Sequence, residues 1–158
     1  MKKCANHYAV AVDLGASGGK MAAASFDGSR IELADYIPFP NQPVQILDTL
    51  YWDVFALYRS IVSGMTQYAS ELGPAATIGI DTWGASYGLL DKKGRLLEPV
   101  YHYRDKRTDT IMDVIYEKVS QRRIFELTGV QFNRTYTLPQ LYSCIVNGDT
   151  CLDNADKL

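Results

Sequence analysis

A short apolar run that ends in an acid and a glycine-rich turn constrains this chain more than any other feature. Residues 8–12 are continuously apolar and predict a buried strand, which leads into Asp-Leu-Gly-Ala-Ser-Gly-Gly-Lys at positions 13–20. Three glycines within five residues allow positive φ and let an anion approach the backbone amides. Ser17 adds a hydroxyl and Lys20 a cation, and an ionised Asp13 suits a hydrated Mg²⁺ beside a phosphate. The pattern is typical of a nucleotide-phosphate cradle.

The spacing of this turn differs from two common phosphate-binding motifs. A Walker loop has one more residue between its first glycine and the Gly-Lys pair. The dinucleotide fingerprint needs a glycine where Ser17 stands. Residues 21–33 predict strand, turn and strand, so the segment joins two strands. A tight hairpin turn, in which Asp and Ser cap backbone amides, is therefore an alternative to the phosphate cradle, and it stays open here.

A second apolar run, at residues 76–80, also ends in an acid and a loop of small residues. A strand, a helix and another strand make a right-handed parallel unit, so Asp13 and Asp81 should lie at the carboxyl ends of adjacent parallel strands. Ligands of such sheets bind outside these strand ends. We therefore expect Asp81, Trp83 and Gly84 to belong to a site. The alternatives are a capping acid, a core aromatic residue and a turn glycine.

The rest of the chain predicts one long helix and several short elements. Apolar residues recur every three or four positions over residues 53–72, which predicts a helix with one face on the sheet. The prolines within 38–43 predict a surface connection. Residues 89–97 predict a hairpin. Residues 111–127 and 138–146 predict helices, each followed by a glycine.

Composition favours a compact protein with small-molecule partners. The chain has 158 residues, of which 47% are hydrophobic and 22% charged, so a single domain with a sizeable core is expected. A net charge of -2 gives no general attraction to nucleic acid or to anionic membranes. No stretch approaches membrane-spanning length, and we expect a cytoplasmic location. Cys4, Cys144 and Cys151 lack disulfide or zinc spacing and are expected to be plain thiols.

Several segments, taken in order, resemble the amino-terminal domain of the FGGY carbohydrate kinases and, within that group, the rhamnulokinase family. They lie at residues 9–20, 51–53, 78–84, 103–108, 129–132 and 137–138. Asp-Thr-Trp-Gly at 81–84 is the segment that distinguishes rhamnulokinases from glycerol and xylulose kinases. The resemblance implies an α/β, ribonuclease H-like (actin-like ATPase) domain over residues 1–158, with a mixed five-stranded sheet and helices on its faces. Family members are about three times as long, which implies that a second, carboxy-terminal domain is absent.

The resemblance also implies an activity, which is transfer of the γ-phosphate of MgATP to the 1-hydroxyl of a ketose, namely L-rhamnulose. The implied phosphate loop consists of Ala16, Ser17, Gly18, Gly19 and Lys20. Asp13 would hold Mg²⁺, and Asp81, Trp83 and Gly84 would form the sugar pocket. The usual loop resembles Ala-Ser-Ser-Gly-Arg, so this chain departs at Gly18 and Lys20. Glycine removes a hydroxyl donor, and lysine keeps the charge of arginine but not its bidentate fork.

In the FGGY family the base that deprotonates the sugar hydroxyl belongs to the second domain, so no catalytic residue is assigned within residues 1–158. The expected partners are sugar, ATP and the second kinase domain, but not nucleic acid or a membrane. An isolated chain would expose apolar residues and is expected to self-associate. One alternative function is a two-metal nuclease of the same fold, which requires a third inward acid. The other is a non-catalytic nucleotide-binding domain of the actin or chaperone type, against which the Asp-Thr-Trp-Gly segment argues.

Overall fold

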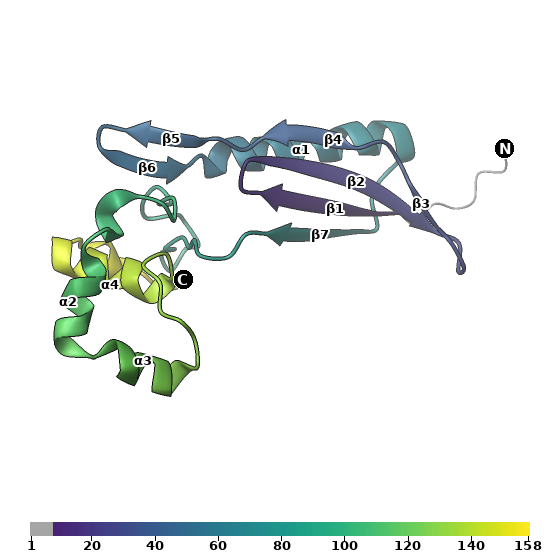
Figure 1. Cartoon of the computed structure of the whole chain (residues 1–158). Coiled ribbons are helices and arrows are strands. Elements are labelled where there is room, and N and C mark those ends of the chain that lie inside the picture. Colours follow the sequence, from purple (N-terminus) through teal and green to yellow (C-terminus); the bar gives the residue numbers. More distant parts are fainter. Residues whose placement is uncertain (1–7) are drawn as a thin grey trace. The chain divides into compact units, whose positions relative to one another are not determined.

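The computed structural model describes residues 8–158, which form two compact units (Figure 1). Residues 8–42 and 53–83 form the first unit, and residues 43–52 and 84–158 form the second. Cys4 lies outside the described residues, and the assignment of residues 1–158 to one domain stays a prediction. No helix within residues 8–158 is both long and apolar enough to cross a membrane.

The first unit is built on a mixed sheet of five strands. These are β1 (Tyr8–Gly15), β2 (Gly18–Phe26), β3 (Ile31–Leu33), β4 (Ile37–Pro40) and β7 (Thr77–Thr82). β1 pairs antiparallel with β2 and parallel with β7, and β3 and β4 both pair with β2. The sheet order is β3-β2-β1-β7. The predicted mixed five-stranded sheet and the predicted strand, turn and strand over residues 21–33 are both confirmed.

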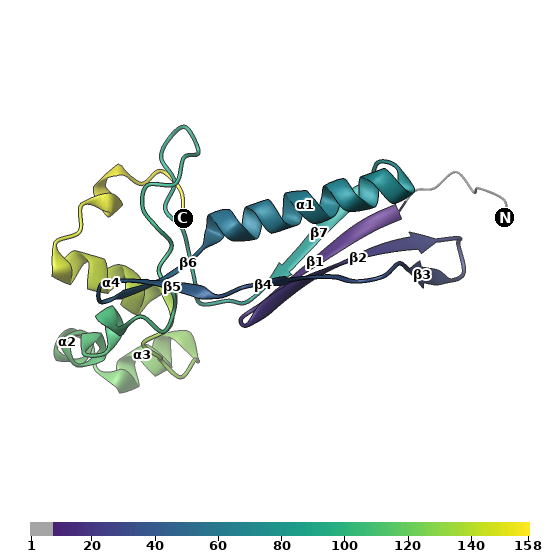
Figure 2. The same cartoon turned by 90° about the horizontal axis from the view of Figure 1, so that it is seen from above.

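A single long helix, α1 (Val54–Leu72), runs along one face of this sheet (Figures 1 and 2). Asp53 caps it by accepting a hydrogen bond from the backbone N–H of Ala56 at 2.9 Å, and Gly73 ends it. The strand residues that face α1 alternate with exposed ones, as a pleated strand requires. The buried core of the unit consists of Tyr8, Val10, Val12, Met21, Ala23 and Tyr68. The predicted helix over residues 53–72 is confirmed.

The prediction of a surface connection at residues 38–43 is wrong. Strand β4 begins before the prolines and pairs with β2 through residue 40, because prolines are tolerated at a sheet edge, where no ladder N–H is needed. Asn41, which follows, is only 3% exposed. Its Nδ2 donates a hydrogen bond to the carbonyl of Gly15 at 2.7 Å. The segment therefore supports the end of β1.

The second unit contains a β-hairpin and four short helical segments, with a further 3-10 turn near its end. The elements are β5 (Pro43–Ile46), β6 (Thr49–Trp52), η1 (Lys106–Thr108), α2 (Ile111–Lys118), α3 (Gln121–Thr128), α4 (Thr137–Asn147) and η2 (Cys151–Asn154). The predicted helices over 111–127 and 138–146 are confirmed, and left-handed Gly129 and Gly148 end α3 and α4. The predicted hairpin at 89–97 is a tight turn closed by one bridge, between Leu90 and Leu96.

Tyr68 joins α1 to the sheet by a polar contact within an apolar core. Its side chain is 2% exposed, and its hydroxyl lies 2.7 Å from the carbonyl of Asp35 and 3.1 Å from that of Met21. We expect Tyr68→Phe to lower the free energy of unfolding by about 1–2 kcal/mol, because buried carbonyls lose their donor. Urea unfolding of the chain measures this, with Tyr58→Phe as the control on the same helix, since Tyr58 is 71% exposed. Equal effects of the two changes would contradict the assignment.

Candidate functional site

The glycine-rich segment is the tip of the hairpin between β1 and β2. Gly15 pairs with Gly18, so that only Ala16 and Ser17 form the turn, and both are exposed. A Cβ at Gly15 would lie 2.7 Å from the carbonyl oxygen of Gly18. A Cβ at Gly19 would lie 2.1 Å from the ring of Phe39 in β4. Gly15 is therefore needed for the close approach of two backbone segments, and Gly19 is needed because the ring of Phe39 lies against its backbone.

The expected use of positive φ is not observed in this turn. Gly15, Gly18 and Gly19 all lack a positive φ, unlike Gly28 in the next turn. The hairpin geometry and the phosphate-cradle hypothesis remain compatible, because the two residues at the tip are exposed. The role of residues 16–20 in binding phosphate stays a prediction.

A row of charged residues crosses three strands at the carboxyl end of β1. Asp13 lies opposite Lys20 of β2 on one side and opposite Asp81 of β7 on the other. Residues directly opposite each other project to the same face of a sheet. This face is the one away from α1, since the neighbouring Val12 is buried in the core. The prediction that Asp13 and Asp81 end adjacent parallel strands is confirmed.

Lys20 contacts Asp13 directly, a contact that the sequence did not predict. Its Nζ lies 3.0 Å from Oδ2 of Asp13, and the two side chains are 58% and 49% exposed. An ion pair this exposed contributes about 0–1 kcal/mol to stability. Its main effect is to offset part of the negative charge that two neighbouring carboxylates create. Both carboxylates remain accessible, and carboxylate oxygens are typical ligands of Mg²⁺.

The described residues hold no cluster of three or more His, Cys, Asp or Glu side chains that could bind a metal ion. His102 is buried between Trp52 and Tyr103, and its Nδ1 accepts a hydrogen bond from the N–H of Arg104. Burial lowers the pKa of His102, which keeps the ring neutral. His102 is therefore a packed core residue of the second unit.

The two described cysteines are free thiols, as predicted. Burial raises the pKa of the Cys144 thiol, and its sulfur lies 3.6 Å from the hydroxyl of Tyr87. Burial, with a hydrogen bond to Glu98, raises the pKa of Cys151 to about 12. Both thiols are thus protonated at neutral pH, and neither has the thiolate character of a nucleophile.

The segment Asp-Thr-Trp-Gly spans the point where the first unit ends and the second begins. Asp81 is exposed at the end of β7, and Trp83 is half-buried in the first unit. Gly84 is exposed, its φ is not positive, and a Cβ built on it meets no atom within 4 Å. A turn that requires glycine at this position therefore finds no support, and the role of Gly84 in a sugar pocket stays a prediction.

The residues after Gly84 are held by a buried polar network that the sequence analysis missed. Ala85 has a φ of 68°, and its carbonyl accepts a hydrogen bond from Nε2 of Gln140 at 2.7 Å. Ser86 accepts a hydrogen bond from Nε1 of Trp52 at 3.0 Å. The partners lie 34 and 55 positions away in the sequence, so no local pattern could have predicted these contacts.

Arg107 anchors the far side of this network. Its guanidinium lies over the ring of Tyr101 at 3.7 Å and donates to Oε1 of Gln140 at 3.0 Å. Its Nε donates to the hydroxyl of Ser143 at 3.3 Å. Nη1 is buried without a hydrogen bond and lies 4.0 Å from Oδ1 of Asp105, which compensates the charge at a distance. In the sequence, the one indication of this contact is the mixture of aromatic and charged residues at 101–107.

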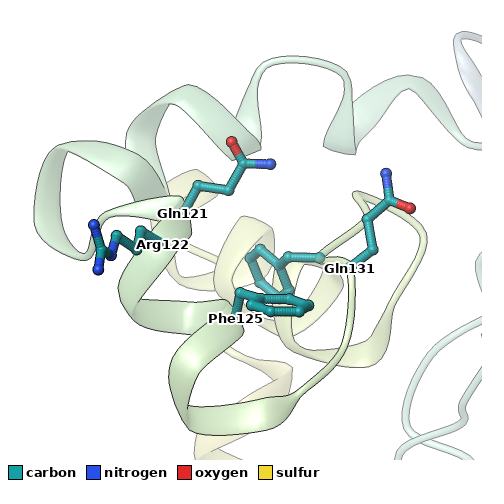
Figure 3. Close-up of a pocket in the computed structure, with 5 residues that line it drawn as sticks. Gln121, Arg122, Phe125 and Gln131 are labelled. Atoms are coloured by element: carbon teal, nitrogen blue, oxygen red, sulfur yellow. The ribbon is translucent and has the colours of Figure 1, made fainter.

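Two surface hollows contain none of the predicted site residues, although the second is lined by Pro38 and Phe39, the strand partners of Lys20 and Gly19. One, of about 500 Å³, is lined by Gln121, Arg122, Phe125, Gln131 and Phe132 (Figure 3). The other, of about 310 Å³, lies between β4 and α1. Figure 3 shows that two phenyl rings line the middle of the first hollow and that Gln121 and Gln131 lie on either side of them. Neither hollow contains a carboxylate or a loop with the features of the Asp13 and Gly84 segments.

Comparisons with known proteins agree with this architecture. Residues 8–150 match the amino-terminal domain of the FGGY family of carbohydrate kinases. Rhamnulokinase of Bacteroides thetaiotaomicron is 37% identical over 148 residues, which are 94% of this chain and 30% of that protein. Rhamnulokinase of Mannheimia succiniciproducens is 39% identical over 133 residues, 83% of this chain and 28% of that protein. The chain thus spans less than a third of the length of these curated relatives.

Solved sugar kinases share the fold. The chain superimposes on a gluconate kinase from Lactobacillus acidophilus with a TM-score of 0.81 and 14% identity, covering 96% of this chain and 31% of that one. A ligand-bound xylulose kinase from the same organism gives a TM-score of 0.80, also with 14% identity, 96% coverage of this chain and 31% of that one. The predicted α/β, ribonuclease H-like (actin-like ATPase) fold is confirmed.

The open space around Gly84 generates a stability prediction. We expect Gly84→Ala to change the free energy of unfolding by less than about 0.5 kcal/mol, because the new methyl group meets nothing. Gly148→Ala is the matched control: its surroundings are equally open, but its φ is 75°. That variant should lose about 1 kcal/mol through backbone strain. Urea unfolding compares them, and a loss at Gly84 as large as at Gly148 would favour the turn interpretation.

Proposed function

The chain belongs to the FGGY family of carbohydrate kinases, and we propose that it is the amino-terminal part of a kinase that phosphorylates the 1-hydroxyl of L-rhamnulose with MgATP. The observation that carries the proposal is the row of Lys20, Asp13 and Asp81 beside an open hairpin tip. The rhamnulokinase relatives, which match nearly the whole chain, support the choice of sugar. The proposal extends beyond this chain, because the relatives are about three times longer.

In this proposal the first unit handles the phosphates. Asp13 holds the hydrated Mg²⁺, which supplies charge neutralisation between the phosphates when bound. The exposed tip residues Ala16 and Ser17, with the Ser17 hydroxyl, contact phosphate oxygens, and Gly18 and Gly19, which lie in the ladder of β2, hold the tip in place. Lys20 leaves Asp13 and meets the phosphates. The exchange costs little, because an exposed ion pair contributes so weakly to stability. In phosphoryl transfer such positioning and charge stabilisation supply most of the catalysis.

The sugar is proposed to lie against Gly84, where the absence of a side chain lets a hydroxyl reach the backbone. Trp83 adds an apolar surface, and Asp81 orients the loop or its waters. The general base for the 1-hydroxyl is assigned to the part of the parent protein beyond this chain.

A two-metal nuclease is the weaker candidate function, since it needs a third acid beside Asp13 and Asp81. The Asp-Thr-Trp-Gly segment argues against a non-catalytic nucleotide-binding domain.

Lys20 gives a test of the phosphate role. In the full-length parent enzyme, we expect Lys20→Ala to raise the KM for ATP roughly tenfold and to leave the KM for sugar unchanged, because a charge-assisted contact to phosphate is lost. Lys20→Arg should retain near-normal ATP affinity, since the family loop usually carries arginine. Lys92→Ala, which removes an exposed lysine from a turn of the second unit, is the control. An unchanged KM and kcat in Lys20→Ala would show that Lys20 serves only Asp13.

A coupled assay of ADP release tests the proposed function itself. The parent enzyme should phosphorylate L-rhamnulose with kcat/KM at least about a hundredfold above D-xylulose, glycerol or gluconate. A preference for another sugar would overturn the assignment of L-rhamnulose, and no sugar-dependent ADP release would overturn the kinase. The 158-residue chain alone is expected to show no transfer, because the base lies elsewhere. Transfer by this chain at the parent's rate would place the base within it, and Asp81 and Asp105 would be the candidates.

A further inference from the structure

Ala85, next to the proposed sugar contact, holds a backbone conformation that alanine seldom adopts. Its φ of 68° lies in the left-handed region, where a Cβ crowds the following carbonyl. Such a residue persists only when its surroundings fix it more strongly than its own preference opposes. Ala85 follows Gly84 directly, so its φ sets the direction in which the backbone of Gly84 presents itself to a ligand.

The contact best placed to fix Ala85 is the side-chain amide of Gln140 in α4. Gln140 is only 1% exposed, and Nε2 donates to the carbonyl of Ala85 at 2.7 Å and to that of Thr135 at 2.6 Å. Its Oε1 accepts a hydrogen bond from Arg107 at 3.0 Å. Two acceptors on one end and a guanidinium on the other allow the amide only one orientation. The donor group of Gln140 is therefore aimed at Ala85 before any ligand arrives.

The network continues to a rigid anchor, so it can resist movement of the loop. Arg107 is held between the ring of Tyr101 and the hydroxyl of Ser143, and Ser143 is itself buried and donates to the carbonyl of Gln140 at 2.7 Å. Buried polar groups that satisfy one another specify a single arrangement, because any alternative leaves a donor or acceptor unpaired.

We propose that Gln140 is a positioning residue for the sugar: by holding the carbonyl of Ala85, it keeps the backbone of Gly84 in the conformation that receives the substrate. The inference rests on the proposed function, in which Gly84 contacts the sugar. Gln140 touches neither sugar nor ATP in this scheme, and it acts through Ala85. A purely structural role for Gln140, joining α4 to the loop, predicts lost stability without a selective change in sugar binding.

The isosteric change Gln140→Glu separates these roles in the full-length enzyme. Glutamate keeps the size of glutamine and the acceptor for Arg107, but it replaces the donor to the carbonyls of Ala85 and Thr135 by a carboxylate oxygen that repels both. We expect the KM for L-rhamnulose to rise roughly three- to tenfold, the effect of losing the hydrogen bond to Ala85, with the KM for ATP unchanged. Ser143→Ala is the comparison variant: it weakens the anchor of Gln140 one step further from Ala85, so we expect a smaller rise in the sugar KM.

A rescue experiment tests whether the effect passes through the backbone of Ala85. Glycine adopts positive φ freely, so Ala85→Gly in the Gln140→Glu background should recover at least about half of the lost sugar affinity. Ala85→Gly alone should change the sugar KM by less than about twofold. Ala85→Val disfavours the positive φ at residue 85 directly and leaves Gln140 intact. It should raise the sugar KM, because β-branched residues rarely tolerate positive φ. It also provides the test if Gln140→Glu does not fold.

The outcomes are distinct from those of the proposed function. An active parent enzyme whose sugar KM is unchanged by Gln140→Glu and by Ala85→Val overturns the positioning role. So does a rise in Gln140→Glu that is no larger than the rise in Ser143→Ala, or one that Ala85→Gly does not rescue. Sugar-dependent turnover that is absent from the unmodified parent overturns the proposed function itself, and the sugar contact at Gly84 with it. A selective rise in the sugar KM, rescued by glycine, supports both.

Discussion

The pairing of β1 with strands on both of its edges is the constraint on which the first unit depends. Because side chains alternate along β1, the same strand gives Val10 and Val12 to the core beneath α1 and Asp13 to the opposite face. A slip of one residue would bury the acid and expose the valines, so the hydrophobic core fixes the register. The register then fixes which residues lie beside Asp13. The charged row at the candidate site is thus a consequence of core packing as much as of the acids themselves.

The sequence predicted this part of the site because the signals were local. Two apolar runs, each ending in an acid and separated by a capped helix, favour a parallel crossover, and if the two strands are neighbours Asp13 lies beside Asp81. The importance of the glycines was predicted as well, but positive φ was the wrong reason. A need for positive φ and a need for close approach both select glycine, so the sequence alone does not distinguish them. Gly19 is needed because the ring of Phe39 covers it, and Phe39 lies in a strand that its prolines concealed.

What could not be predicted depends on partners that are far apart in the sequence. Asn41 reads as a surface residue until β4 pairs with β2 and brings it to the carbonyl of Gly15. The same holds for Arg107 and Gln140, which are 33 positions apart and carry no pattern that relates them. A buried polar group can be identified from its sequence only when its partner is known, whereas an apolar stripe or a capped helix end shows its environment by its own spacing.

The two candidate regions solve the problem of holding a ligand in different ways. At the charged row, the backbone is fixed by strand pairing, and only the exposed side chain of Lys20 has to move, which requires the exchange of one weak ion pair. At Gly84 the ladder of β7 has ended, two residues earlier, so the loop depends on side-chain hydrogen bonds from Gln140 and Trp52. A loop that is already held in a strained conformation does not have to be ordered when a ligand binds, and the entropy of that ordering is not subtracted from the affinity. Strain at Ala85 is then the cost of a preformed binding surface, and the buried network offsets it during folding.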